Sequence, residues 1–261
     1  MNAPINPTKT EEVNAEFYNK LYKKRNVLFQ LIYPFISYDQ QSKSKYNYSY
    51  IKSLIQSSGI TSNFKYMDYG FGHGSLLLKL PFKDGLFGCD ISIEAVANFP
   101  RVAKLLGKNV TTFTPAKFEA SEIKMNLISL SHVLEHVNDD HKLLSEIFSK
   151  LEDKGHVLIN VPINEVWEDP KHVRKYTPES MKKLLEDVGF KVLSINEENK
   201  LSGYLLINER VKKPGFLKRI MYRMFRLFMA LMPLSFIKRF DKILGDKYQY
   251  QHLIAIAQKN G

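Results

Sequence analysis

The chain has 261 residues, of which 44% are hydrophobic and 25% are charged. This balance fits a folded protein with one substantial core and excludes collagen-like, low-complexity and disordered classes. Its single cysteine, Cys89, excludes an internal disulfide framework and a site built from several thiolates, and it favours a reducing, cytoplasmic compartment. Lys and Arg outnumber Asp and Glu by 38 to 27, a net charge of +11, which favours nucleic acid, a membrane surface or an anionic substrate as partner.

The first 60 residues are expected to form helices. Their polar, acidic start, MNAPINPTKTEEVNAEF, lacks the apolar run of an export signal. An apolar segment follows, and a helix over 48–59 ends in a glycine. No Pro, Gly and Ser-rich linker divides the chain, so we expect an N-terminal helical lid over 1–60 and one main domain over 61–261, with a helical insertion at about 200–246.

Strand and helix patterns then alternate along the chain. Such alternation, repeated five times, indicates a parallel sheet with helices on both faces, because a parallel crossover needs about a dozen residues. The last two strands have no simple crossover helix between them. The expected strands are 64–70, 85–92, 109–114, 125–131, 155–162, 191–198 and 248–259, and the expected helices are 75–80, 93–107, about 136–155 and 178–190.

A glycine-rich turn follows the first strand. It reads D-x-G-x-G-x-G at Asp68, Gly70, Gly72 and Gly74, and small residues there let a ligand approach the backbone before the next helix. Ligands of open parallel sheets bind at the carboxyl ends of the strands. Ser75 stands where a dinucleotide fingerprint has glycine, which speaks against a nicotinamide-dependent oxidoreductase without removing that alternative. A tight structural turn would give the same glycines.

An aspartate ends the second strand. Asp90 lies 22 residues after Asp68, where a carboxylate can accept hydrogen bonds from both hydroxyls of a ribose. The alternative is that Asp90 caps the helix that begins near Ser92, and the two roles are compatible. The two features together predict an adenosine-type ligand.

At this point the sequence resembles the class I S-adenosylmethionine-dependent methyltransferases, from about Phe64 to Glu197 with the last strand added. The resemblance rests on KYMDYGFGHG, LFGCDIS, NLISLSHVLEHVNDD, LEDKGHVLINVP and HVRKYTPESMKKLLEDVGF. It implies an α/β fold, Rossmann-like, with a seven-stranded sheet in the order 3-2-1-4-5-7-6 and strand 7 antiparallel. It also implies S-adenosylmethionine as cofactor and S-adenosylhomocysteine as product.

The resemblance assigns roles to residues of this chain. It places the glycine turn around the methionine end of the cofactor, Asp90 on the ribose and Ile91 beside the adenine. The stretch TTFTPAKFEA lacks the Asp with which many relatives contact the adenine amino group, so backbone or Phe118 would have to replace it. The full set of implied cofactor residues is Asp68, Gly70, Phe71, Gly72, His73, Gly74, Asp90, Ile91, Ser131 and His132.

Methyl transfer requires a base for the acceptor's proton, and imidazole suits this task because its pKa lies near neutrality. His136 is the candidate base, and Glu135 is the second candidate catalytic residue. His172, Arg174 and Tyr176, from the H-V-R-K-Y-T segment, are the candidate acceptor residues. The alternatives are that Glu135 faces solvent and that His172 and Arg174 only hold their loop.

His132, Glu135 and His136 also spell H-x-x-E-H, the inverted zinc-peptidase motif. That motif needs both histidines on one helix, whereas His132 directly follows an apolar strand, so a peptidase is not expected. Some quinone-biosynthesis and RNA methyltransferases hold a divalent cation at an E-x-x-E-H cluster here, but His132 replaces the first Glu and hard cations prefer oxygen. We therefore expect no metal, and a divalent cation at this cluster stays open as the alternative.

The insertion before the last strand carries most of the charge. Residues 211–247 hold ten Lys and Arg against two Asp. On a helix, Lys218, Arg219, Arg223 and Arg226 share one arc, opposite Leu217, Ile220, Met221, Met224, Phe228 and Leu231. Its longest uncharged stretch, 227–237, is too short to span a bilayer. This pattern favours peripheral contact of residues 212–242 with anionic membrane. A cap over the active site or a dimer surface remains open, whereas nucleic acid would require interleaved exposed aromatics.

We therefore expect a cytoplasmic enzyme that methylates an oxygen, or less readily a nitrogen, of a small or lipid-linked acceptor. A surface-glycan precursor, a nucleotide-activated sugar or another phosphate-bearing molecule suits the H-V-R-K-Y-T segment and the basic charge. A quinone-like or lipid acceptor at the membrane surface is the alternative. From another class, a non-catalytic membrane-binding module would keep the basic helix without needing cofactor. The oligomeric state stays open.

Overall fold

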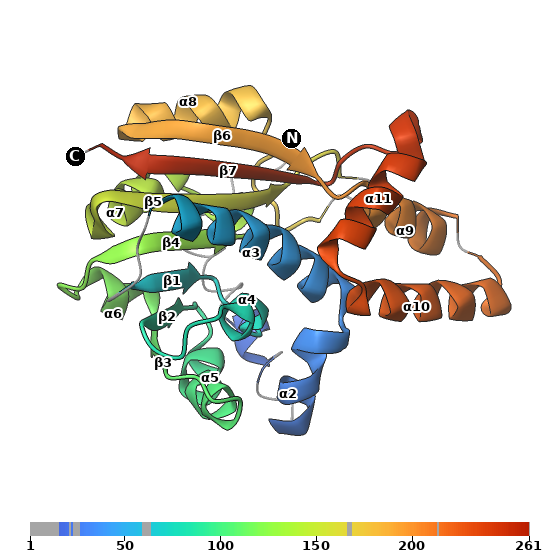
Figure 1. Cartoon of the computed structure of the whole chain (residues 1–261), viewed down its shortest axis with the longest axis horizontal. Helices are drawn as coiled ribbons and strands as arrows, with labels where there is room; N and C mark the ends of the chain where they lie inside the picture. Colours follow the sequence, from blue (N-terminus) through green and yellow to red (C-terminus); the bar gives the residue numbers. More distant parts are fainter. Residues whose placement is uncertain are drawn as a thin grey trace.

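The computed structural model describes residues 16–20, 22, 27–58, 64–165, 169–212 and 214–260. Its centre is a seven-stranded sheet in the order β3-β2-β1-β4-β5-β7-β6 (Figure 1). The neighbouring strands from β3 to β5 pair in parallel, and β7 is antiparallel to both β5 and β6. This confirms the expected Rossmann-like order. The strands are β1 (Tyr66–Tyr69), β2 (Leu86–Cys89), β3 (Val110–Phe113), β4 (Met125–Ser131), β5 (Leu151–Pro162), β6 (Phe190–Glu198) and β7 (His252–Lys259).

Helices cover both faces of the sheet, because successive strand residues point to opposite faces. Tyr66, Leu127 and Leu158 belong to the core on one face, with helices α3, α4, α5, α9, α10 and α11. Met67, Ile128 and Val157 belong to the other core. The helices of the first face are α2 (Val27–Ile36), α3 (Tyr38–Ser58), α4 (Ser75–Lys79), α5 (Ile93–Leu105), α9 (Lys200–Leu206), α10 (Phe216–Leu231) and α11 (Leu234–Leu244), and those of the second are α6 (Pro115–Glu119), α7 (Asp140–Lys150) and α8 (Pro178–Val188).

Three short helical turns lie between these elements: η1 (Leu134–His136), η2 (Ile207–Val211) and η3 (Gly245–Lys247). The expected helix over 136–155 is wrong at both ends. Asp139 caps α7 by accepting a hydrogen bond from Lys142 N, so the helix starts at Asp140. Its end is set by pairing in the sheet, because Leu151 already lies opposite Met125 of β4. The sequence pattern also missed α6, a single turn inside TTFTPAKFEA.

The helix α3 belongs to the body of the protein rather than to a peripheral lid. Its Tyr46 and Ile51 are fully buried, and Asn47 Oδ1 accepts a hydrogen bond of 2.7 Å from Asn160 Nδ2 of β5. In Figure 1, α3 crosses the front of the sheet, and one end of α3 meets α10. The proposed boundary between residues 60 and 61 lies outside the described residues, as do most of residues 1–26.

The basic insertion forms α9, α10 and α11 at one end of the molecule (Figure 1). The prediction that Arg226 belongs to the exposed basic arc is wrong. Arg226 turns inward and pairs with Asp39 of α3 at 2.7 Å and with Glu209 at 2.6 Å. Lys218, Arg219 and Arg223 are exposed, as expected. Lys213 lies outside the described residues. In the described part of the chain, no helix combines the length and the apolar character that crossing a membrane requires.

Candidate functional site

The glycine turn joins β1 to α4 at the carboxyl edge of the sheet. Gly70, Gly72 and Gly74 all have positive φ, at 78°, 54° and 69°. A Cβ atom on Gly70 would lie 2.4 Å from Val133 Cγ2, and one on Gly74 would lie 2.0 Å from the ring of Phe99. Both conformation and space therefore require glycine at these two positions. The turn brings backbone amides to the end of β1, as the sequence indicated.

Asp90 holds this turn against the end of β2. Its Oδ2 accepts a hydrogen bond of 2.8 Å from Gly72 N, and its Oδ1 accepts one of 2.9 Å from Ser92 N. Ser92, not Asp90, is the N-cap of α5, because its hydroxyl accepts from Ala95 N. Each carboxylate oxygen of Asp90 keeps a lone pair for a further donor. Ile91 beside it is 37% exposed and offers an apolar surface.

Asp68 lies in β1, two residues before the glycine turn, and its side chain is bonded within the sheet. Its Oδ1 accepts a hydrogen bond of 2.8 Å from Ser129 Oγ of β4, and that hydroxyl lies 2.5 Å from the hydroxyl of Tyr66. Burial raises the pKa of Asp68 to about 7 and also raises the pKa of Asp90. The assignment of Asp90 to the ribose, of Asp68 and the glycine turn to the methionine end and of Ile91 to the adenine of S-adenosylmethionine stays a prediction. Phe118, the expected substitute contact to adenine, is buried in the core beside Tyr69 and Phe113.

Residues near the N-terminus cover the glycine turn. The rings of Tyr22 and Tyr33 pack edge-on against His73, with centroid distances of 4.9 and 4.7 Å. Asn19 Oδ1 accepts a hydrogen bond of 2.9 Å from Ser92 Oγ. The sequence predicted a lid but named none of these contacts, because aromatic residues in a helix carry no signal of what they pack against. A small pocket remains, lined by Tyr22, Gln30, Gly72, His73, Glu94, Ala95, Phe99 and Val102.

A second group of functional side chains lies just beyond β4. Ser131 ends the strand, and His132 follows it with a left-handed backbone, at φ 56°. Its amide donates a hydrogen bond of 2.7 Å to Asn160 O of β5. The turn η1 then presents Glu135 and His136. Because His132 lies outside that single turn, the two histidines do not share a helix, and the inverted zinc-peptidase arrangement is absent.

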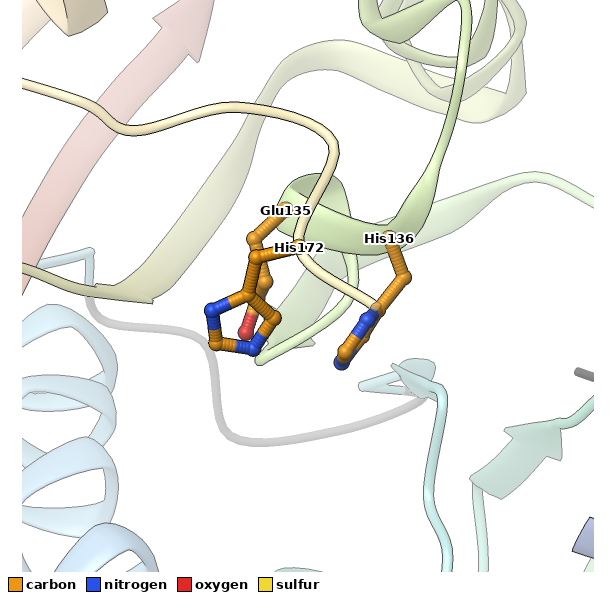
Figure 2. Close-up of side chains that lie close together, drawn as sticks. All are labelled: Glu135, His136 and His172. Atoms are coloured by element: carbon orange, nitrogen blue, oxygen red, sulfur yellow. The ribbon is translucent and has the colours of Figure 1, made fainter. Parts of the chain in front are cut away.

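The loop before α8 is fastened to this turn. Val173 N donates a hydrogen bond of 2.8 Å to Glu135 O, and His136 Nδ1 lies 3.2 Å from Lys171 O. These contacts bring His172 beside His136, with ring centroids 4.8 Å apart, and Figure 2 shows both rings converging with the Glu135 carboxylate. His172 therefore joins the adjacent residues Glu135 and His136 in one cluster, as expected from the sequence for the acceptor side.

Arg174 and Tyr176 have other partners in this loop. Arg174 forms an ion pair with Asp140 and donates a hydrogen bond to Asn138 O. The Tyr176 hydroxyl donates a hydrogen bond of 2.8 Å to Asp140 Oδ2, and its ring is buried. Both side chains thus connect the loop to the first turn of α7. The acceptor role that the sequence suggested for them stays a prediction, and their observed contacts position His172.

The cluster is buried, and burial sets its charge. Glu135 is only 1% exposed, so its pKa is raised. Burial lowers the pKa of His136, and lowers those of His132 and His252 well below the ordinary value. The imidazoles are therefore neutral at pH 7 and able to accept a proton. Glu135 does not face solvent, which excludes that alternative.

Sequence reasoning missed three residues of this neighbourhood. His252 starts β7, and its ring lies 5.2 Å from that of His132. Because β7 is antiparallel, its first residue falls at the edge where β5 ends, so the expected sheet order already contained this signal. Glu165 contacts His172 at 2.6 Å, and Lys43 of α3 interacts electrostatically with Glu135. Neither has a recognisable pattern in the sequence.

Comparisons with known proteins agree with this fold. A family model described as a methyltransferase domain matches residues 27–195. A search of curated proteins finds no match. Among solved structures, magnesium protoporphyrin IX methyltransferase from Synechocystis PCC 6803 with bound S-adenosylmethionine superposes with a TM-score of 0.55, 14% identity and full coverage of both chains.

Two further solved structures show how varied proteins of this fold are. Phosphoethanolamine N-methyltransferase 2 from Haemonchus contortus, in complex with phosphomonomethylethanolamine and S-adenosylhomocysteine, has a TM-score of 0.52 and 16% identity, covering 92% of this chain and 61% of that chain. The [4+2]-cyclase SpnF has a TM-score of 0.50 and 15% identity, covering 76% of this chain and 74% of that one. At such identities the likeness shows the fold alone.

Proposed function

The chain belongs to the methyltransferase-domain family and is an S-adenosylmethionine-dependent methyltransferase, and from this premise we propose that it methylates a hydroxyl of a phosphate-bearing acceptor. The observation that carries the proposal is the position of Glu135, His136 and His172, which converge beyond β4 at the same edge of the sheet as the glycine turn. A neutral imidazole buried there can take the acceptor's proton as its oxygen attacks.

The chemistry divides between the cofactor and the protein. Bound S-adenosylmethionine supplies an electrophilic methyl group on its sulfonium. The chain's own residues must orient the acceptor oxygen, exclude water and accept one proton. His136 is the proposed base: Lys171 O lies 3.2 Å from its Nδ1, which leaves Nε2 with the lone pair that would take the proton. Glu135 would stabilise the imidazolium that forms.

The net charge of +11 and the exposed basic residues of α10 support an anionic acceptor, such as a nucleotide-activated sugar or a lipid-linked precursor of a surface glycan. The phosphate-bearing molecule bound to the Haemonchus contortus enzyme shows that the fold accommodates such ligands. A quinone-like or lipid acceptor is the alternative, and it would depend on hydrophobic rather than ionic contacts.

The outer face of α10 favours an acceptor presented by a membrane. Its apolar residues are exposed, among them Phe216 at 76%, Leu217 at 75% and Met221 at 69%. Lys218, Arg219 and Arg223 lie exposed on the same helix. A cap over the active site would bury this apolar face, and here it is exposed. Apolar side chains flanked by cations fit an anionic phospholipid surface, so we propose that α10 lies on one, at the inner face of the cell membrane.

The first experiment is calorimetric titration of the purified protein with S-adenosylmethionine, S-adenosylhomocysteine and NADH. We expect binding of the first two at micromolar concentrations and none of NADH. The second step is a methyl-transfer assay on nucleotide sugars, lipid-linked sugars and quinones, with His136→Ala as the matched variant. We expect this variant to keep its cofactor affinity and to turn over more slowly by about 10²-fold or more. An unaltered rate on the true acceptor would exclude His136 as the base.

A further inference from the structure

The cluster beyond β4 has the composition of a metal site. Glu135, His136 and His172 each offer one ligand atom, and these atoms all lie within 4.8 Å of one another. In Figure 2 the carboxylate of Glu135 and the ring of His172 lie side by side, with the His136 ring turned toward them. Tetrahedral zinc sites need ligand atoms about 3.3 Å apart, so side-chain rotations that move these atoms by about 1 Å would bring them to coordinating distance.

The nitrogen atoms that would bind a metal are already selected. Lys171 O lies 3.2 Å from His136 Nδ1, and a carbonyl can only accept, so Nδ1 carries the proton and Nε2 carries the lone pair. His172 Nδ1 lies 2.6 Å from Glu165 Oε1, and this close contact with a carboxylate favours a proton on Nδ1, which leaves the lone pair on Nε2. Metal-binding histidines are oriented by this type of contact to a carbonyl or a carboxylate.

Glu135 gives a second, independent indication. Its side chain is 1% exposed, and neither carboxylate oxygen accepts a hydrogen bond from any other residue that the structure describes. The groups facing it are His132, whose Nδ1 lies 3.2 Å from Oε1, and Lys43, which acts on it electrostatically. A buried carboxylate without hydrogen bonds is unfavourable, and a coordinated cation would satisfy both of its oxygens.

We propose that Glu135, His136 Nε2 and His172 Nε2 bind one divalent transition-metal ion, of which Zn²⁺ is the reference probe. Two imidazoles and one carboxylate suit Zn²⁺ or Mn²⁺, whereas Mg²⁺ and Ca²⁺ prefer oxygen ligands. This proposal revises the expectation from sequence that no metal is used. Binding needs neither cofactor nor acceptor. One consequence rests on the proposed methyl transfer. The ion would bind the acceptor oxygen and lower the pKa of its hydroxyl group, and His136 would then be a metal ligand instead of the base.

The test is titration of the chelator-treated full chain with Zn²⁺ by calorimetry and with Co²⁺ by visible absorption. We expect one equivalent of each to bind and no comparable binding of Mg²⁺. Glu135→Gln and His172→Ala should weaken Zn²⁺ binding by more than about 100-fold, and Glu165→Gln, which alters only the orientation of His172, by about 10-fold or more. His141→Ala, at an exposed histidine of α7, is the matched control and should bind as the unaltered chain does.

S-adenosylhomocysteine affinity, measured on every variant, separates loss of metal from loss of fold. The proposal is overturned if the unaltered chain takes up no stoichiometric Zn²⁺, or if Glu135→Gln and His172→Ala bind it as tightly as His141→Ala. Absence of S-adenosylhomocysteine binding alongside intact Zn²⁺ binding would contradict the proposed function instead, so the two failures are distinguishable.

Discussion

The Asp90 carboxylate fastens two backbone segments at once, the glycine turn through Gly72 N and the start of α5 through Ser92 N. Its remaining lone pairs are those expected to receive the ribose hydroxyls. Asp90→Ala should therefore weaken S-adenosylhomocysteine binding by more than about ten-fold, the 1.5–3 kcal/mol of hydrogen bonds to a charged group. Asp90→Asn, which keeps one acceptor oxygen, should lose less. Calorimetric titration checks both, and equal affinity of Asp90→Ala and the unaltered chain would remove Asp90 from the cofactor site.

Asp68 should make stability depend on pH. Burial raises its pKa from an ordinary 3.8 to about 7 in the folded protein. Between these pH values the folded state holds a proton that the unfolded chain has lost, so the free energy of unfolding falls as pH rises from 4 to 7. Asp68→Asn removes this contribution, and its stability relative to the unaltered chain should rise by about 4 kcal/mol between pH 4 and pH 8.

Urea unfolding of both forms without cofactor, at pH 4 and pH 8, measures this change for Asp68. His132 and His252 act in the opposite direction, because their lowered pKa values cost stability as pH falls below the ordinary histidine pKa. Both histidines are present in the two forms and cancel in the comparison. A difference between the forms that does not change with pH would show that Asp68 is ionised throughout this range.

At the scale of residues, the sequence predicted where a site residue lies along a strand or turn better than it predicted which residues contact it. Gly70, Gly74 and Asp90 were identifiable because spacing after buried strands fixes where they lie. The convergence of His172 on His136 depends on a hydrogen bond from Val173 N to Glu135 O, between a loop and a turn that no local pattern connects. Lys43 and Glu165 reach the cluster from other elements for the same reason.

At the scale of elements, strands such as β2 and β4 were predictable because each is a short apolar run bounded by turn residues, whereas β5 begins at Leu151, four residues before the expected strand. The start of α7 could not be predicted, because Asn138 and Asp139 are both good N-caps and only the structure shows that Asp139 is used. Arg226 shows the limit of an amphipathic pattern. The pattern placed it in the arc of exposed basic residues, but it pairs instead with two acidic residues, the exposed Asp39 of α3 and the largely buried Glu209 of η2.

The exposed face of α10 predicts binding to anionic membranes. The unaltered chain should cosediment with vesicles containing phosphatidylserine and not with neutral ones. Changing Leu217, Met221 and Met224 to Ser should weaken this binding by more than about ten-fold, because each buried CH₂ contributes about 0.8 kcal/mol. Changing Lys218, Arg219 and Arg223 to Gln should cost about 1 kcal/mol per charge.

The matched control for α10 is Leu105→Ser on α5, an apolar residue that is 68% exposed outside the insertion. It should sediment as the unaltered chain does. Point variants are preferable to deleting the insertion, since Lys45 Nζ donates hydrogen bonds to Ala230 O and Met232 O and ties α10 to α3. If the triple Ser variant binds vesicles as the unaltered chain does, α10 is not the membrane contact.

At the scale of the whole molecule, the residues before α3 contact three parts of the site that the sheet keeps separate. Tyr22 and Tyr33 cover the glycine turn through His73, and Asn19 contacts the start of α5. Lys171 Nζ, on the loop that carries His172, lies 3.4 Å from the ring centroid of Phe17. Residues before α3 therefore contact both the cofactor side and the acceptor side of the site.

This arrangement predicts that the segment governs how slowly the cofactor leaves. Tyr22→Ala removes an aromatic contact of about 0.5–1.5 kcal/mol, so S-adenosylhomocysteine should dissociate about 2- to 12-fold faster, with a smaller change in its association rate. Stopped-flow displacement measures both rates, and Ile32→Ala, at a 44% exposed position of α2, is the control. An unchanged dissociation rate in Tyr22→Ala would mean that the segment is fixed architecture. The cofactor would then enter by a route that leaves the contact between Tyr22 and His73 intact.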